Sequence, residues 1–370
     1  MRFRALGRTG VDVSMLGLGC MRFPSEEETC RIVDECVRQG INYFETSPGY
    51  GDSELWLGKA LLGKDRRKVM VSTKSSPIDV TCQTADQVRR RIEDSLKRLQ
   101  TDYLDFYHAW SINSPQQYQI MMTKGGWLEG VLKARDEGLI RHVGMTSHST
   151  PQHISEILNE GIFEVLTVQY SLILQSYRDC IRQAAGRGVG VILMGPLAGG
   201  LLCDPSPVLA RSFAPDDQVT GAFKYVLSDP NVSVALSGMT SAKQVAENCA
   251  RIDALPADLA MSYQDRANEQ INAMLGETVG QFETVLCGGC RYCVNACPRG
   301  LSPFNIFKSY NMAMLGGQPA WSARMQASAE ALLLKCTRCG KCEVICPQKI
   351  NVPRHMERVK AHFEKQSGRN

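Results

Sequence analysis

Residues 14–47 read SMLGLGCMRFPSEEETCRIVDECVRQGINYFETS. The short apolar runs at 14–20 and 42–47 predict β-strands. The stretch 26–40 between them has the apolar spacing of an amphipathic helix and ends on Gly40, as helices commonly do. Because neighbouring parallel strands need such a crossover helix, residues 14–47 predict one unit of a parallel α/β fold.

The same alternation of strand and helix continues to about residue 250. Six further strands are predicted at 69–74, 104–110, 141–147, 165–171, 190–195 and 232–238. Further amphipathic helices are predicted at 86–100, 127–138 and 241–252. Eight strand–helix units in series indicate an α/β protein with a (β/α)₈ TIM barrel. The stretch GLGCMRFP lacks the glycine fingerprint of an open dinucleotide-binding sheet, and a hairpin over 3–14 is expected to close the barrel floor.

Two cysteine runs, CGGCRYCVNACP (287–298) and CTRCGKCEVICP (336–347), follow the barrel sequence. Both have the pattern C-x₂-C-x₂-C-x₃-C-P of two-cluster ferredoxins, in which the fourth cysteine of each run ligates the other cluster. We therefore expect one [4Fe–4S] cluster on Cys287, Cys290, Cys293 and Cys346, and a second on Cys336, Cys339, Cys342 and Cys297. The alternative is a pair of structural zinc ions, which would leave the third and fourth cysteines of each run oddly placed.

Length and composition support two domains. At 370 residues the chain exceeds one average domain. We expect a barrel over 1–255, a helical linker over 256–285 and a small, mostly helical, ferredoxin-like iron–sulfur domain over 286–370. Within the last domain, helices are expected at 302–317 and 321–335, between the cysteine runs.

Charge and cysteine content indicate which partners and which cellular compartment to expect. The net charge of +4 gives no argument for nucleic acid or a membrane surface, and no run approaches the roughly 18 apolar residues of a membrane span. Fifteen cysteines without a signal peptide favour free thiolates in a reducing compartment. We therefore expect a cytoplasmic protein.

Four ionisable side chains follow successive barrel strands. Glu45 and Tyr50 come at and after the second strand, Lys74 ends the third, and His108 lies at the end of the fourth. Functional residues of TIM barrels lie at these strand ends. An adjacent ammonium lowers the pKa of a phenol, a carboxylate can hold that ammonium, and an imidazole can orient a substrate oxygen. This set can protonate a carbonyl oxygen while hydride reaches its carbon.

The stretches that carry these residues resemble the aldo-keto reductase superfamily over roughly residues 1–255. They are LGRTGVDVSMLGLGCMRF (6–23), GINYFETSPGYGDSELWLGKAL (40–61), VSTK (71–74), YHAW (107–110), PLAGGLL (196–202) and SGMTSAKQVAEN (237–248). With its cysteine-rich tail the chain is similar to the bacterial and archaeal branch that has a C-terminal 4Fe–4S ferredoxin domain. The resemblance implies that Glu45, Tyr50, Lys74 and His108 form the catalytic tetrad, with Tyr50 as general acid.

The resemblance also implies that NADPH or NADH lies across the barrel mouth without a Rossmann fold. The residues expected to hold it are Thr146, Ser147 and Gln169 at the nicotinamide amide, Met194 at its ring, Gly195, Pro196 and Leu197 near the phosphates, and Ser237, Gly238, Met239, Thr240, Gln244, Glu247 and Asn248 at the adenosine end.

Four positions depart from the family pattern. Glu45 replaces the usual Asp, Ser147 replaces a common Asn, Met194 replaces an aromatic residue, and Gln244, next to Lys243, stands where many NADPH-using members have Arg. The choice between NAD and NADP therefore stays open.

The leading hypothesis is an oxidoreductase that reduces a small-molecule carbonyl, or oxidises an alcohol, with NAD(P)H. The clusters would relay electrons to or from an external ferredoxin or flavin carrier. Hydride transfer moves two electrons whereas a cluster passes one, so a bound flavin stays open although no flavin signature is present. Two alternatives remain: clusters that supply single electrons directly to a barrel-bound substrate, and a non-catalytic electron-transfer module. The oligomeric state is open.

Overall fold

The computed structural model describes residues 1–275, 287, 292–314, 322–346 and 350–366. The chain divides into two compact units. The barrel unit comprises Met1–Gln169, Tyr177–Met194 and Leu227–Ala260, and the C-terminal unit comprises Tyr170–Ser176, Gly195–Val226 and Met261–Asn370. No helix in the described ranges is long and apolar enough to cross a membrane.

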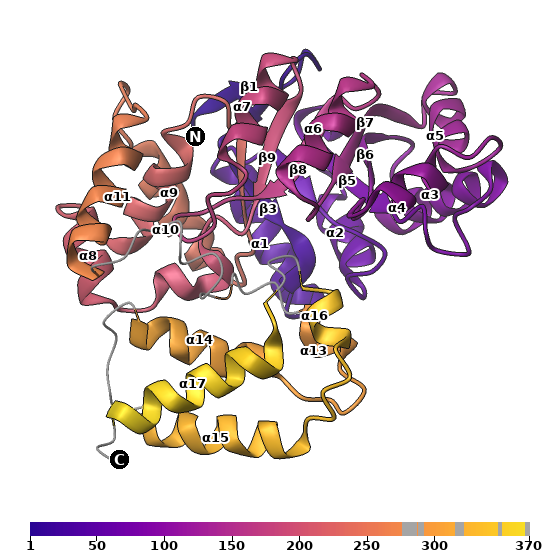
Figure 1. Ribbon diagram of the computed structural model, residues 1–370. Coiled ribbons are helices and arrows are strands. Elements are labelled where there is room, and N and C mark those ends of the chain that lie inside the picture. Colours follow the sequence, from indigo (N-terminus) through magenta and orange to yellow (C-terminus); the bar gives the residue numbers. More distant parts are fainter. Residues whose placement is uncertain (276–286, 288–291, 315–321, 347–349, 367–370) are drawn as a thin grey trace. The chain divides into compact units, whose positions relative to one another are not determined.

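Eight parallel strands form a closed barrel in the order β10-β3-β4-β5-β6-β7-β8-β9, which confirms the predicted TIM barrel (Figure 1). The strands are β3 (Leu16–Gly19), β4 (Tyr43–Glu45), β5 (Met70–Ser75), β6 (Leu104–Ala109), β7 (Ile140–Thr146), β8 (Val165–Gln169), β9 (Gly190–Met194) and β10 (Val234–Ser237). Each lies within one or two residues of a predicted strand, because short apolar runs bounded by turns are buried on both faces here.

Helices alternate with these strands. In the barrel unit they are α1 (Glu26–Arg38), α2 (Ser53–Leu61), α3 (Ala85–Leu99), α4 (Pro115–Met121), α5 (Trp127–Asp136), α6 (Pro151–Asn159), α7 (Arg178–Gly186) and α10 (Ala242–Asp253), with short 3-10 turns at η1 (Cys20–Arg22) and η2 (Arg66–Lys68). The helix α3 shows how the sequence sets them. Thr84 and Gln87 form a reciprocal capping box at its start, and Val88, Ile92 and Leu96 bury one face.

An antiparallel hairpin of β1 (Phe3–Ala5) and β2 (Asp12–Ser14) precedes the barrel. Its Leu6 and Val13 are fully buried in one apolar cluster with residues at the starts of barrel strands, including Tyr43, Val165 and Val234. Burying one such aliphatic side chain contributes about 1.5–3 kcal/mol. The hairpin therefore closes the barrel floor, as the sequence predicts.

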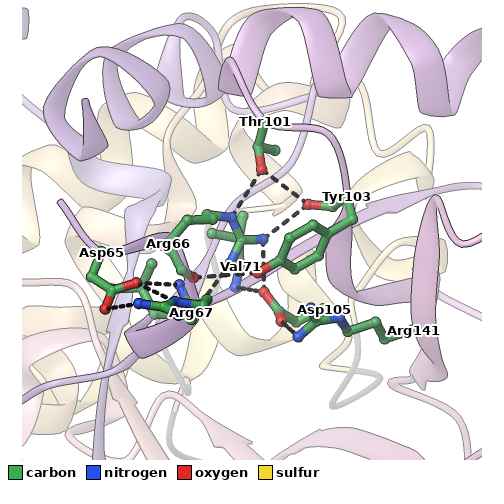
Figure 2. A network of polar contacts seen from close by, with 9 residues as sticks. Asp65, Arg66, Arg67, Val71, Thr101, Tyr103, Asp105 and Arg141 are labelled. Carbon is green, nitrogen blue, oxygen red and sulfur yellow. Dashed lines mark hydrogen bonds and ion pairs between the residues drawn. The ribbon is translucent and has the colours of Figure 1, made fainter. Parts of the chain in front are cut away.

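A polar network lies on the barrel wall around Asp105 of β6 (Figure 2). The buried Asp105 carboxylate contacts Arg66 at 2.8 Å and Arg141 at 3.3 Å, and accepts a hydrogen bond from the Val71 N–H. Both guanidinium groups also stack on the Tyr103 ring, at 4.2 and 3.9 Å from its centroid. One carboxylate thus holds two cations that enclose an aromatic ring.

Replacing Asp105 with asparagine is expected to lower the free energy of unfolding by about 3 kcal/mol, because two cations lose their buried partner. Thermal and denaturant unfolding followed by circular dichroism measure this. The matched control is Asp179→Asn, which removes an exposed pair with Arg182 and should change stability by less than about 0.5 kcal/mol. If the two variants lowered the free energy of unfolding equally, Asp105 would not be the main stabilising partner of Arg66 and Arg141.

The C-terminal unit is helical. Its helices are α8 (Pro207–Phe213), α9 (Gln218–Leu227), α11 (Ser262–Leu275), α13 (Tyr292–Ala296), α14 (Pro303–Met314), α15 (Ser322–Lys335), α16 (Lys341–Val344) and α17 (Val352–Gln366), with a 3-10 segment η3 (Ala198–Cys203). The helices α14, α15 and α17, orange to yellow in Figure 1, share one apolar core that includes Phe307, Leu332 and Met356. The predicted helices at 302–317 and 321–335 are present as α14 and α15, whereas α17 was not predicted.

The C-terminal unit also contains two segments, 170–176 and 195–226, that follow β8 and β9 directly. The division into 1–255, 256–285 and 286–370 does not anticipate this, and those boundaries stay predictions. Of the predicted linker, the described part contains α11.

Candidate active site and cluster-binding cysteines

Glu45 and Lys74 form a buried ion pair at the carboxyl ends of β4 and β5. Lys74 lies beside His108 in the register of β5 and β6. The Lys74 ammonium is 4.5 Å from the centroid of the Tyr50 ring and 5.9 Å from that of Trp110. The barrel therefore brings the four predicted catalytic side chains together at one rim.

Burial lowers the pKa of Lys74 from its usual value to about 7. The Glu45 carboxylate in contact with the ammonium acts in the opposite direction, because it favours the charged form. Burial disfavours the charged form of Lys74, so the ammonium depends on Glu45 to stay charged. This ammonium lies close to the face of the Tyr50 ring.

His108 is a neutral imidazole. Burial, followed by the charge of Lys74, lowers the pKa of His108 to about 3. Neither ring nitrogen has a hydrogen-bond partner of good geometry in the described part of the chain. A Cβ atom at Gly144 would lie 2.7 Å from Cε1 of His108, so this glycine makes room for the ring. Apart from a weak contact with the Met145 backbone, the buried imidazole is available to a ligand oxygen.

Tyr50 is half-buried in the turn between β4 and α2. Its ring meets Trp110 edge to face, with centroids 6.0 Å apart and planes at 83°. A Cβ atom at Gly49 would lie 2.5 Å from the Trp110 ring, so glycine is required for this close approach. Packing against Trp110 thus sets the position of the phenol.

The residues expected at the nicotinamide amide are buried at the ends of β7 and β8. The Thr146 hydroxyl accepts a hydrogen bond from the Ser111 N–H at 2.8 Å. The Ser147 hydroxyl donates to the Ile112 carbonyl and accepts from the Ser149 N–H. Ser147 therefore links the loop after β6 to the loop after β7. Gln169 has a side-chain amide, which can donate and accept hydrogen bonds with the carboxamide of a nicotinamide.

His148 was not among the predicted site residues. It is buried next to Gln169, whose side chain hydrogen-bonds to it, and burial lowers the pKa of His148 to about 4. Its position in the stretch GMTSHS, directly after the expected amide-binding pair, is the signal that could have identified it.

The residues expected at the other end of the cofactor begin at β10. The Ser237 hydroxyl lies 3.5 Å from the Asn248 amide nitrogen, and Met239 is buried. The Gln244 side chain accepts hydrogen bonds from the N–H and the hydroxyl of Thr240, the residue before the Ser241 N-cap of α10. Glu247 lies 3.8 Å from Lys243.

Arg22 was also missed by the sequence analysis. A Cβ atom at the exposed Gly238 would lie 3.6 Å from Cδ of Arg22, so a cation flanks open backbone there. An anionic group can approach such a position closely. Arg22 beside Gly238 therefore fits the phosphates of a bound dinucleotide, and His108 fits the oxygen of a substrate. Met194 and Leu197 are half-buried, Gly195 has a φ of 69°, and Pro196 is buried.

The cysteines of the second run line one hollow. Cys336, Cys339 and Cys342 surround a space of about 320 Å³ together with Cys297 of the first run. Four thiols around one hollow fit the ligand set of a [4Fe–4S] cluster. These four cysteines line the hollow without converging on one point, since within the described residues no three His, Cys, Asp or Glu side chains come close enough together to hold a metal ion.

The other cysteine group is partly described. Burial raises the pKa of Cys293 to about 11, and the charges of Cys346 and then Cys342 add to this effect. Cys287 packs against the α14–α15–α17 core, and Cys290 lies outside the described residues. The assignment of individual cysteines to the two clusters stays a prediction.

Asn311 holds Cys287 by both backbone groups. Its side-chain oxygen accepts a hydrogen bond from the Cys287 N–H at 3.1 Å, and its amide nitrogen donates to the Cys287 carbonyl at 2.8 Å. Asn311 is fully buried. It was missed because it lies 24 residues away in the sequence and belongs to no motif.

A parallel barrel with a buried Lys–Glu pair at its catalytic rim, joined to a cysteine-rich helical region, defines a TIM-barrel oxidoreductase with an iron–sulfur domain. The model of the aldo/keto reductase family matches residues 15–207, and the model of the 4Fe-4S dicluster domain matches residues 286–351. The chain belongs to the aldo/keto reductase family and carries a C-terminal 4Fe–4S dicluster domain. It therefore acts on a small molecule.

Known relatives agree with this placement. L-galactose dehydrogenase of Arabidopsis thaliana is 31% identical over 69% of this chain and 89% of its own length. The NADH-specific methylglyoxal reductase of Escherichia coli is 25% identical over 74% of this chain and 88% of its own. The holo form of an aldo-keto reductase from Bacillus halodurans superimposes with a TM-score of 0.64 at 28% identity, covering 73% of this chain and 96% of that structure.

Proposed function

We propose that the barrel reduces a carbonyl compound, or oxidises the corresponding alcohol, with NAD(P)H and with Tyr50 as the acid–base group. The observation that carries this proposal is Lys74, a buried ammonium between the Glu45 carboxylate and the Tyr50 ring, next to a neutral His108. NADH use is named for one relative, and NAD(P)H is typical of the family.

Each side chain has a distinct task in this reaction. Bound NAD(P)H would supply the hydride to the carbonyl carbon. Tyr50 gives its phenolic proton to the carbonyl oxygen, and Lys74 makes this possible near neutral pH by stabilising the phenolate. Glu45 keeps Lys74 charged. His108, neutral at pH 7, donates an N–H hydrogen bond that orients the same oxygen.

The names of three relatives support a proposal for the substrate class. Their names include L-galactose dehydrogenase, 6-dehydroglucose reductase and methylglyoxal reductase, which all indicate small, oxygen-rich carbonyl or alcohol substrates. We propose a substrate of this class.

We further propose that the two clusters exchange electrons with an outside carrier. When bound, they supply one-electron transfer. Supporting this, Cys287 lies close to Ala198, Gly199 and Leu201 of η3, the segment that directly follows β9. Lys308 of α14 also pairs with Asp204 after η3, at 2.7 Å.

The test is an anaerobic titration of the cluster-loaded chain with NADPH and then NADH, followed by the visible iron–sulfur absorbance. Bleaching by a nicotinamide is expected, because the barrel and the clusters would share electrons. Bleaching by dithionite alone would separate them and favour direct single-electron chemistry or a non-catalytic barrel. Steady-state carbonyl reduction, assayed in parallel, reports the barrel reaction independently.

The pH dependence should report Lys74. It is charged below its pKa of about 7 and neutral above it, so kcat/KM for reduction should fall as pH rises through this value. In Glu45→Gln the favourable carboxylate is lost, so the decline should begin about one pH unit lower. Profiles of kcat/KM against pH for both proteins measure this. If kcat/KM declined at the same pH in both proteins, Glu45 would not influence the pKa of Lys74.

A further inference from the structure

The two parts of the chain carry opposite formal charge. Residues 286–370 contain 13 lysines and arginines against four glutamates and no aspartate, a formal charge of +9. Residues 1–285 contain 29 lysines and arginines against 34 acidic residues, a formal charge of −5. The net value of +4 conceals this asymmetry, which makes the cysteine-rich part a cationic body.

Part of this positive charge borders the hollow of Cys297, Cys336, Cys339 and Cys342. Arg299 and Arg338 line it, and Lys341 lies between Cys339 and Cys342 in the chain. All three cations are exposed, as is Cys339 itself. Of these three cations, only Arg338 forms an ion pair within the part of the chain that the structure describes, at 2.9 Å from Glu357.

Exposed apolar side chains lie beside the same cysteines. Leu334 and Val344 are 88% and 77% exposed, more than any other large apolar side chain in the part of the chain that the structure describes. Leu334 precedes Cys336 by two residues, and Val344 follows Cys342 by two. Apolar contacts inside a charged rim are typical of sites where proteins dock transiently.

We propose that this surface, formed by Arg299, Leu334, Arg338, Cys339, Lys341 and Val344, docks a small acidic protein that carries one electron at a time. The inference rests on the proposed relay and specifies its entry point. The carrier loses one electron and the cluster held by Cys297, Cys336, Cys339 and Cys342 gains it. The exposed Cys339, in a hollow that three half-buried cysteines share and that exposed cations border, favours this occupant over nucleic acid or a membrane, because neither of these exchanges electrons with a cluster.

Stopped-flow reduction of the cluster-loaded full chain tests the proposal. The probe is an acidic flavodoxin in its hydroquinone form, which becomes the semiquinone on giving up one electron. Substrate and nicotinamide are left out. For the variant Arg299→Glu/Lys341→Glu, the second-order rate constant at low ionic strength should fall about tenfold or more, and high salt should remove most of the difference.

The matched control is Lys97→Glu/Arg182→Glu, which makes the same charge change at exposed positions of α3 and α7. It should retain the wild-type rate, and dithionite should reduce all three proteins equally. Equal rates in the rim variant and wild type, or an equal loss in the control, would overturn the proposal. The proposal would also be overturned if the wild type and the control bound DNA or anionic vesicles in a salt-sensitive way and only the rim variant did not bind them. Failure of the barrel chemistry would instead appear in the carbonyl assay and leave these rates unchanged.

Discussion

Replacing Tyr50 with phenylalanine is expected to lower kcat for carbonyl reduction by about a thousandfold, the effect of removing a general acid. The phenol near Lys74 is the group that we assign to proton transfer, and phenylalanine keeps the ring that meets Trp110 edge to face. Steady-state kinetics with a small hydroxyketone or ketoaldehyde, in NADH and in NADPH, measure the loss. Iron content should not change.

The control is Tyr43→Phe, which removes a hydroxyl from the barrel floor. It should leave kcat within about twofold, because Tyr43 begins β4 and packs in the floor cluster with Leu6 and Val13, whereas barrel chemistry occurs at the opposite strand ends. Should Tyr50→Phe retain more than a tenth of the activity, another group would have to supply the proton.

Replacing Asn311 with leucine is expected to remove one of the two clusters. The change leaves both backbone groups of Cys287 without their buried partner, at a cost of about 1–3 kcal/mol each. Iron content should fall from about eight to about four atoms per chain, the values for two [4Fe–4S] clusters and for one. Electron paramagnetic resonance of the reduced protein should show one cluster signal.

Cys339→Ser is the complementary variant, because it removes a thiol from the other hollow. The signal that survives in Asn311→Leu should be the one that is lost in Cys339→Ser. Full iron content and both signals in Asn311→Leu would show that Cys287 keeps its position without the amide.

Local patterns were sufficient for the barrel. All eight strands come from short apolar runs, and each pairs with the next barrel strand along the chain except at the closure of β10 on β3, so the pattern and the topology agree. The helix α17 could have been predicted too. Its buried Val352, Met356, Val359 and Phe363 recur at helical spacing in VPRHMERVKAHFEKQ.

Contacts between distant residues could not be predicted. Asn311 and Cys287 lie in separate elements, and neither neighbourhood predicts the pairing. The same holds for Arg22 beside Gly238, because they follow β3 and β10, two strands that pair only when the barrel closes. Ser147 is the reverse case, in which a motif predicts more than the local contacts show. Its motif predicts contact with a ligand, whereas its hydroxyl donates a hydrogen bond to the Ile112 carbonyl.

The segments after β8 and β9 are tied to α11. The Tyr170 hydroxyl donates to Gln264 at 3.0 Å, Gln264 donates to the Tyr225 carbonyl at 2.7 Å, and the Asn268 side chain bonds to both Gln175 and Tyr225. A gene cut after residue 255 would therefore strip these loops of their anchors. A shortened chain that is meant to keep residues 170–176 and 195–226 in place should therefore retain α11 together with the barrel strands.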